Sequence, residues 1–294
     1  MEKTHNKGKK LILAVWICAA LLLAAVAAAV ALEIRETRKL QAQSQPDFVP
    51  ETSEQQETEE KQEESQTEKT GWDLPENPYG PEDFFHEGDY LVCHAGESRI
   101  GVDVSAWQEE IDWVQVKEAG IDFAMIRLAW RGSTEGGLFE DERARENYVG
   151  AKEAGLQVGG YFFSQAITPE EAVEEAEFLL NMIDGWELEL PLVYDWEFAG
   201  GSRTENMDEE TINACTVAFC DTIAAAGYEA MVYFSPVNDY EINLEALKDH
   251  KFWMALWMPE MDFDYRVDMW QYTDSGSVPG INTPVDMNIL FLYE

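Results

Sequence analysis

The sequence predicts an α/β fold in which the C-terminal part of the chain forms an irregular (β/α) barrel. After Ile100 the chain carries eight apolar runs rich in β-branched and aromatic residues, and helical segments lie between the first five. Repeated alternation of strand and helix predicts a parallel sheet, and eight strands suggest closure into a barrel. The later runs follow one another too closely for full helices, so we expect the barrel to be irregular.

The eight expected strands are short, apolar and bounded by polar or glycine-containing segments. They cover residues 100–104, 123–130, 157–165, 190–198, 230–236, 252–257, 267–273 and 285–291.

The expected helices cover 112–119, 141–154, a segment that opens at Thr168, and 208–226. Three of them are followed by a glycine, the residue that best adopts the left-handed cap conformation: Gly120, Gly155 and Gly227. Thr168 suits an N-cap, Pro169 suits the first helical position, and Glu171 stands where a capping box needs it. These signals fix where the helices begin and end.

Residues 11–32 form an uninterrupted apolar run. At ~1.5 Å per residue the run reaches roughly 33 Å, enough to cross a hydrocarbon core of ~30 Å. Lysines precede it within residues 1–10, and a basic flank tends to stay in the cytoplasm. We therefore expect a single-pass anchor in the cell membrane, with a cytoplasmic N-terminus and an extracellular domain. The alternative is secretion after signal cleavage, because Ala27, Ala28 and Ala29 suit a peptidase, although a signal core is usually only ~7–15 residues.

The chain between this run and the barrel divides into two segments. Residues 33–70 are rich in Glu, Gln, Ser and Thr and almost lack large apolar groups, so they cannot bury enough surface to offset their ordering entropy. We expect a disordered acidic linker there. Residues 71–98 carry aromatic residues and prolines and are expected to be an ordered lead-in to a catalytic domain at 99–294.

Several functional classes are excluded or disfavoured by composition and motifs. The formal net charge of −38 argues against nucleic acid as a partner, because phosphate binding needs a basic surface. Cys215 and Cys220 stand five apart in an expected helix, a poor arrangement for a mutual disulfide. No Cys/His pattern suggests zinc, and no GxSxG, HExxH or Walker motif is present. We expect no metal and no cofactor.

Four acidic residues lie at or near strand ends, where a (β/α) barrel carries its reactive groups: Asp103, Asp195, Glu197 and Asp286. Asp195 and Glu197 are two apart in one strand, and such side chains share a face. Repulsion and partial burial raise the pKa of one of two neighbouring carboxyl groups. Glycoside hydrolysis needs such a pair, one group protonated and one ionised. A D-x-E pair is also common in solvent-exposed strands. The flanking LPLVY indicates a buried strand, however, where carboxyl groups without a partner or a function cost folding free energy.

Aromatic residues are abundant around the same strand ends, and flat rings suit the apolar faces of sugars. They are Trp107, Trp130, Tyr161, Phe163, Trp196, Tyr233, Trp257, Trp270 and Tyr272. Core packing is the simpler explanation for any single ring, but their number favours a carbohydrate cleft over a site for a small charged metabolite.

From about Ile100 onward the chain resembles glycoside hydrolase family 25, the peptidoglycan-cleaving lysozymes or N-acetylmuramidases. The resemblance rests on seven motifs in the expected order: GVDVSAWQEEIDW, FAMIRLAWRG, GGYFFSQAITPEEAVEEAEFLL, LPLVYDWEF, MVYFSP, MWQYTDSGSVPGI and VDMNIL. It implies an irregular (β/α) barrel that cleaves the β-1,4 bond between N-acetylmuramic acid and N-acetylglucosamine. Peptidoglycan glycan strands are then the expected partner, and local wall remodelling is the expected use of an anchored enzyme.

The resemblance also implies a role for each site residue. Glu197 matches the general acid, and Asp195 matches its partner carboxylate, which stabilises positive charge on the sugar or orients the substrate's acetamido group. Asp103 and Asp286 match two further acids that line the cleft. The substrate-binding residues expected from the resemblance and from the aromatic pattern are Tyr161, Phe163, Tyr233, Trp257 and Gln271. Trp257 departs from the family, which usually has Tyr there, so the flat face is kept and the hydroxyl is lost.

Three questions stay open at this point. A chitinase-like barrel also carries a strand-end D-x-E, although usually with a longer acidic series on that strand. A membrane-tethered wall-binding protein without catalysis is an alternative of a different class. The Cα atoms of Asp195 and Glu197 are expected ~6.6 Å apart, which fits the carboxyl separations of both retaining and inverting enzymes. The resemblance favours a retaining route assisted by the substrate.

Overall fold

The computed structural model describes residues 72–198, 201–237, 242–258 and 260–293. The expected basic flank (1–10), membrane anchor (11–32) and linker (33–70) lie outside the described residues. Within those ranges no helix combines the length and apolar character needed to span a bilayer.

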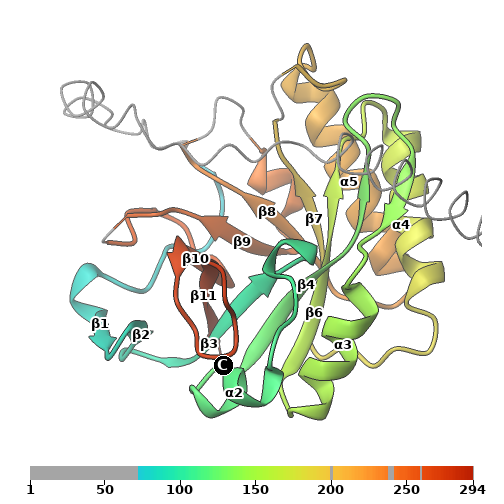
Figure 1. The fold of residues 1–294 in the computed structure, drawn as a ribbon. Coiled ribbons are helices and arrows are strands. Elements are labelled where there is room, and N and C mark those ends of the chain that lie inside the picture. Colours follow the sequence, from blue (N-terminus) through green and yellow to red (C-terminus); the bar gives the residue numbers. More distant parts are fainter. Residues whose placement is uncertain (1–71, 199–200, 238–241, 259, 294) are drawn as a thin grey trace, which may run out of the picture. The chain divides into compact units, whose positions relative to one another are not determined.

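Eight strands form a closed barrel (Figure 1). They are β3 (Glu97–Val104), β4 (Phe123–Arg131), β6 (Gln157–Ser164), β7 (Leu192–Trp196), β8 (Ala230–Phe234), β9 (Lys251–Ala255), β10 (Met269–Gly276) and β11 (Val285–Leu292). Their order is β3-β11-β10-β9-β8-β7-β6-β4, and pairing of β3 with β4 closes the ring. Each expected strand overlaps one of these, so the prediction of an eight-stranded α/β barrel is confirmed. The short strand β5 (Leu138–Glu140), antiparallel to β4, was not expected.

The expectation of a wholly parallel sheet is wrong for the last strand. β11 runs antiparallel to both of its neighbours, β10 and β3, whereas all other barrel pairs are parallel. The physical reason is the short connection 277–284 between β10 and β11. Parallel neighbours need a crossover of about a dozen residues or more, while a short turn suffices for antiparallel ones.

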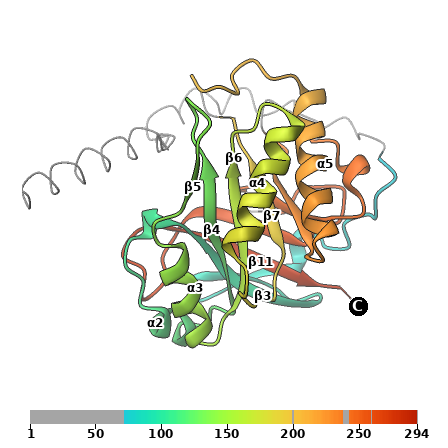
Figure 2. The ribbon, with the colours of Figure 1, turned by 90° about the vertical axis from the view of Figure 1, so that its right-hand side faces the viewer.

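The expected helices are all present, as α2 (Trp113–Glu118), α3 (Ala144–Glu153), α4 (Pro169–Met182) and α5 (Glu209–Ala225). Asp112, Thr168 and Asp208 cap α2, α4 and α5 by accepting a backbone N–H of the first turn. Figure 2 shows α3, α4 and α5 over β4, β6 and β7. Cys215 and Cys220 on α5 are buried free thiols, as expected. The part of the chain that the structure describes also contains three single-turn 3₁₀ helices: η2 (Pro81–Asp83), η3 (Ala106–Gln108) and η4 (Leu244–Leu247).

The segment before the barrel covers the part of the barrel wall that α2, α3, α4 and α5 leave uncovered. It contains the hairpin of β1 (Phe84–Glu87) and β2 (Tyr90–Cys93). The ring of Phe84 meets Trp270 of β10 edge-on at 5.1 Å, and Tyr79 stacks on Phe291 of β11 at 4.8 Å. The Leu91 N–H donates to the Tyr272 hydroxyl at 3.3 Å. This lead-in thus takes the place that helices occupy on the other side of the barrel.

Apolar side chains fill the barrel interior and close its floor. The buried residues of this inner cluster are Phe123, Met125, Val193, Met231, Trp253, Met269 and Leu290. Side chains alternate along a strand, so inward-facing residues beyond this plug line the mouth of the barrel.

Candidate active site

The structure brings the four expected acids together at the mouth. Asp195 lies two residues after Val193 of the inner plug, so β7 directs it to the interior face. Glu197 follows just past the end of β7 and lies beside Asp195. Asp103 lies near the end of β3, and its register partner on β11 is Asp286. Asp286 is the second residue of its strand, not a C-terminal strand end as expected. It reaches the mouth because β11 runs in the opposite direction.

Asp103 and Asp286 form one carboxyl pair, and amide side chains bind it. Asp103 Oδ2 accepts hydrogen bonds from Gln271 Nε2 (2.9 Å) and Asn288 Nδ2 (2.7 Å). Burial raises the pKa of Asp103, while the hydrogen bonds from Asn288 and Gln271 oppose that rise. Burial and then the charge of Asp103 raise the pKa of Asp286 well above its usual range. Asp286 is therefore the member of this pair that holds a proton.

Asp195 and Glu197 form the second pair. Burial and then the neighbouring charge of Glu197 raise the pKa of Asp195 well above its usual range. Burial also raises the pKa of Glu197, against a hydrogen bond with Asp195. A hydrogen bond between two carboxyl groups needs a proton on one of them, so the pair shares a proton where isolated carboxyl groups are ionised. Asp195 Oδ1 is buried and has no hydrogen-bond partner.

Gln271 connects the acids to the aromatic residues. Its Oε1 accepts from the Tyr233 hydroxyl (3.3 Å) and from Trp257 Nε1 (3.0 Å), and its Nε2 also lies 3.3 Å from Asp286 Oδ2. The Trp257 side chain is 50% exposed, so its ring is available to a ligand. Gln271 therefore fixes the orientation of Trp257 relative to the acids.

The other expected rings divide between the mouth and the outer core. Tyr161 and Tyr233 pack edge-on against Trp253 of the inner plug, and Phe163 is the register partner of Asp195. Trp107, after β3, is exposed. The expectation is wrong for three rings that are buried outside the mouth, because they pack against other core residues: Trp196, Trp270 and Tyr272. Trp130 is the register partner of Phe163, so it shares the inner face with Asp195, and its ring stacks on Phe139 of β5.

Sequence reasoning missed Arg127 of β4. It is buried, two residues after Met125 of the inner plug, and its Nε donates to Asp141 Oδ2 at 2.8 Å. Its charge opposes the rise in the pKa of Tyr161 and of Asp195, so it is the cation of this acidic mouth. The sequence did contain a signal for it, because Arg127 is a charged residue in an apolar strand, at the two-residue spacing that places it on the inner face with Met125.

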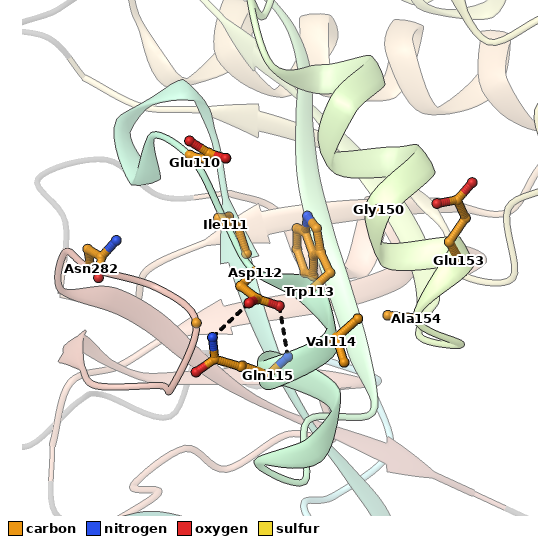
Figure 3. A pocket seen from close by; sticks show the side chains of 11 residues that line it. Glu110, Ile111, Asp112, Trp113, Val114, Gln115, Gly150, Glu153, Ala154 and Asn282 are labelled. Atoms are coloured by element: carbon orange, nitrogen blue, oxygen red, sulfur yellow. Dashed lines mark hydrogen bonds between the residues drawn. The ribbon is translucent and has the colours of Figure 1, made fainter.

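A surface hollow of about 740 Å³ lies elsewhere (Figure 3). It is formed by α2, the end of α3 and the loop around Gly280, and none of the four acids lines it. The carboxylate of Asp112 there is already bound to Gln115. Across the described ranges, no group of three or more His, Cys, Asp or Glu side chains is arranged to hold a metal ion.

Comparison with known proteins finds relatives of similar sequence and fold. The autolytic lysozyme of Clostridium acetobutylicum is 32% identical over 192 residues, which cover 64% of this chain and 54% of that protein. The autolysin LytC of Streptococcus pneumoniae shares the fold, with a TM-score of 0.60 and 23% identity over 70% of this chain and 51% of that one. The chain thus spans about half the length of these two proteins.

A shorter relative is covered almost completely. The structure of the bacterial lysozyme of Streptomyces coelicolor matches with a TM-score of 0.52 and 25% identity, over 66% of this chain and 91% of that one. The family model "Glycosyl hydrolases family 25" matches residues 102–281, more than half of the chain. The resemblance in the sequence motifs is thereby confirmed, and the protein belongs to glycosyl hydrolase family 25.

Proposed function

We propose that this protein is a muramidase that hydrolyses the β-1,4 bond between N-acetylmuramic acid and N-acetylglucosamine in peptidoglycan. The observation that carries the proposal is the buried Asp195–Glu197 pair, in which the charge of Glu197 raises the pKa of Asp195, in a mouth lined by two further acids. One of the solved family structures, LytC, is described in complex with a synthetic peptidoglycan ligand.

Glu197 is the general acid in this proposal, and Asp195 is its partner. The substrate's acetamido N–H donates to the carboxylate of Asp195, which turns to present an oxygen to the substrate, because Oδ1 is buried without a protein partner in the free protein. This hydrogen bond favours the ionised form of Asp195, so the proton that the free pair holds on Asp195 moves to Glu197. Glu197 then protonates the glycosidic oxygen as the C1–O bond breaks, and the acetamido oxygen closes on C1.

Water completes the reaction. The Glu197 carboxylate accepts a proton from the attacking water, which opens the ring formed by the acetamido group and regenerates the acid. Asp103 and Asp286 hold Gln271, which in turn orients Trp257 and Tyr233. These rings, with Tyr161 and Phe163, bind the sugars around the bond that breaks.

Digestion of purified cell wall by Glu197→Gln and Asp195→Asn variants tests the proposal. Loss of a general acid typically costs about 10²–10⁴-fold in rate. The control Glu153→Gln removes one negative charge from an exposed residue of α3 and should leave the rate unchanged. Mass spectrometry of the fragments should find N-acetylmuramic acid at the reducing end. Release from chitin, binding without new reducing ends, or full activity of Glu197→Gln would each overturn it.

We propose that residues 11–32 anchor the protein in the cell membrane and that 33–70 form an extended acidic linker. Support comes from the length of the apolar run, the lysines before it and the composition of the linker. The catalytic domain then lies outside the membrane, near newly made wall. An intact N-terminus in the membrane fraction supports this, whereas a mature N-terminus after residue 29 supports secretion instead.

A further inference from the structure

The general acid lies just beyond the last residue that the sheet holds. β7 ends at Trp196. On one side of β7 the last register pair is Trp196 with Ser164 of β6, and on the other side it is Asp195 with Tyr233 of β8. Glu197 is followed by the exposed Phe198. The strand ladder therefore does not fix the backbone of Glu197, although acid catalysis depends on the position of its carboxyl group.

The side chain of Gln165 holds this backbone. Gln165 follows the last residue of β6 and is fully buried. Its Nε2 donates to the carbonyl oxygen of Glu197 at 2.8 Å and to that of Ser164 at 2.9 Å. One amide group thus joins the end of β6 to the residue after β7.

The other atom of the Gln165 amide is held as well. Its Oε1 accepts a hydrogen bond from Thr204 Oγ1 at 3.3 Å, and Thr204 is buried. The neighbouring Arg203 pairs with Glu171 at 2.6 Å, and its N–H donates to the Ser133 carbonyl at 2.8 Å. The segment that carries Thr204 is therefore fixed to α4 and to the loop after β4. Gln165 is bound on both sides, so its amide is a rigid support.

We propose that Gln165 is a positioning residue for Glu197: its amide clamps the Glu197 backbone so that the carboxyl group stays against Asp195 and faces the glycosidic oxygen. This inference rests on the proposed role of Glu197. A glutamine is suited to the task because its amide donates and accepts in opposite directions at the same time. Neither a carboxylate nor an apolar side chain of that length does both.

The test is steady-state kinetics of Gln165→Met on a soluble glycan substrate. Methionine matches the length and removes both hydrogen bonds. A misplacement near 1 Å can cost about 10²-fold, so we expect kcat to fall by about 10–10²-fold while KM changes less than about threefold. Release of the clamp also lets water reach Glu197, which lowers its pKa, so the basic limb of the kcat–pH profile should move to lower pH.

Gln165→Glu supplies a signature that a general loss of stability does not produce. A glutamate keeps the acceptor for Thr204, but its carboxylate cannot donate to the Glu197 carbonyl. Once protonated it can donate again. Relative to the unmodified protein, the activity of this variant should recover as the pH falls. This readout decides the matter even where Gln165→Met does not fold.

Thr216→Val is the matched control. Thr216 is fully buried on α5 and donates to the Ile212 carbonyl at 2.9 Å, away from the mouth. It should lose stability with kcat and pH profile unchanged. Unchanged kcat and profile in Gln165→Met, or no recovery of Gln165→Glu at low pH, would overturn the clamp. Full activity of Glu197→Gln would instead overturn the proposed function, so the two failures are distinct.

Discussion

Replacing Glu175 by glutamine should stabilise the protein at alkaline pH relative to acid pH. Glu175 of α4 is fully buried, accepts from Arg131 Nε and Ser164 Oγ at 2.6 Å each, and ties α4 to β4 and β6. Burial raises its pKa from 4.5 to about 7, against the hydrogen bond from Ser164 and the charge of Arg131. The ion pair therefore does not fully compensate for burying the charge.

The sign of the effect follows from the raised pKa. The folded protein binds the proton of Glu175 more tightly than the unfolded chain does. The stability that this proton contributes is therefore fully present below the unfolded pKa of 4.5 and is lost as the pH rises through the folded pKa of about 7. At ~1.4 kcal/mol per pKa unit, the full change is about 3 kcal/mol, of which about 2.5 falls between about pH 5 and about pH 8.5.

Urea unfolding of Glu175→Gln and the unmodified protein at those two pH values measures this change. Glutamine does not titrate, so the difference in unfolding free energy should shift by about 2.5 kcal/mol in favour of the variant at the higher pH. Any constant cost of the lost ion pair cancels in that comparison. The control is Glu174→Gln, which contacts the same Arg131 but has a side chain that is 60% exposed. A difference that is equal at both pH values refutes the reasoning.

Two further predictions concern the lead-in and the mouth. In a chain that begins at Glu97, Trp270 and Phe291 lose their contacts with the rings of Phe84 and Tyr79. In thermal scans this chain should aggregate, or melt at a lower temperature than a chain that begins at Gly71. Equal melting temperatures would contradict the covering role of the lead-in. Trp257→Phe keeps the flat ring but removes the bond to Gln271, so KM should rise about three- to tenfold with kcat little changed, and an unaltered KM would remove Trp257 from the binding site.

Alternation along strands explains how much of the site the sequence predicts. Asp195 and Glu197 face inward because they are two apart, and the same rule requires that Trp196 between them faces outward. The expectation that aromatic residues near strand ends line the cleft did not take this alternation into account. Applied to β4, it places Arg127 on the inner face with Met125, so this cation was within reach of the sequence.

Other features depend on contacts that no local pattern encodes. The motif around Asp286 predicted an acid of the site, but the direction of β11 is set by a short connection and by pairing with β3. The link from Gln165 to Glu197 joins residues that are 32 apart and depends on adjacent strands ending together. The hairpin of β1 and β2 turns at Gly88, with φ of +66°, but its apolar partners lie on β10 and β11, at the far end of the chain.

The reversed β11 has a consequence for how the barrel is connected to anything else. Leu292 pairs with Glu97, so the last strand ends where the first barrel strand begins, and Asp103 and Asp286 lie at the opposite ends of the same two strands. Trp72 also contacts Tyr265, just ahead of β10, at 5.6 Å. Both ends of the described chain thus leave from the floor. A tag, a surface support or a second module attached after Tyr293 therefore starts on the side of the barrel opposite to substrate entry.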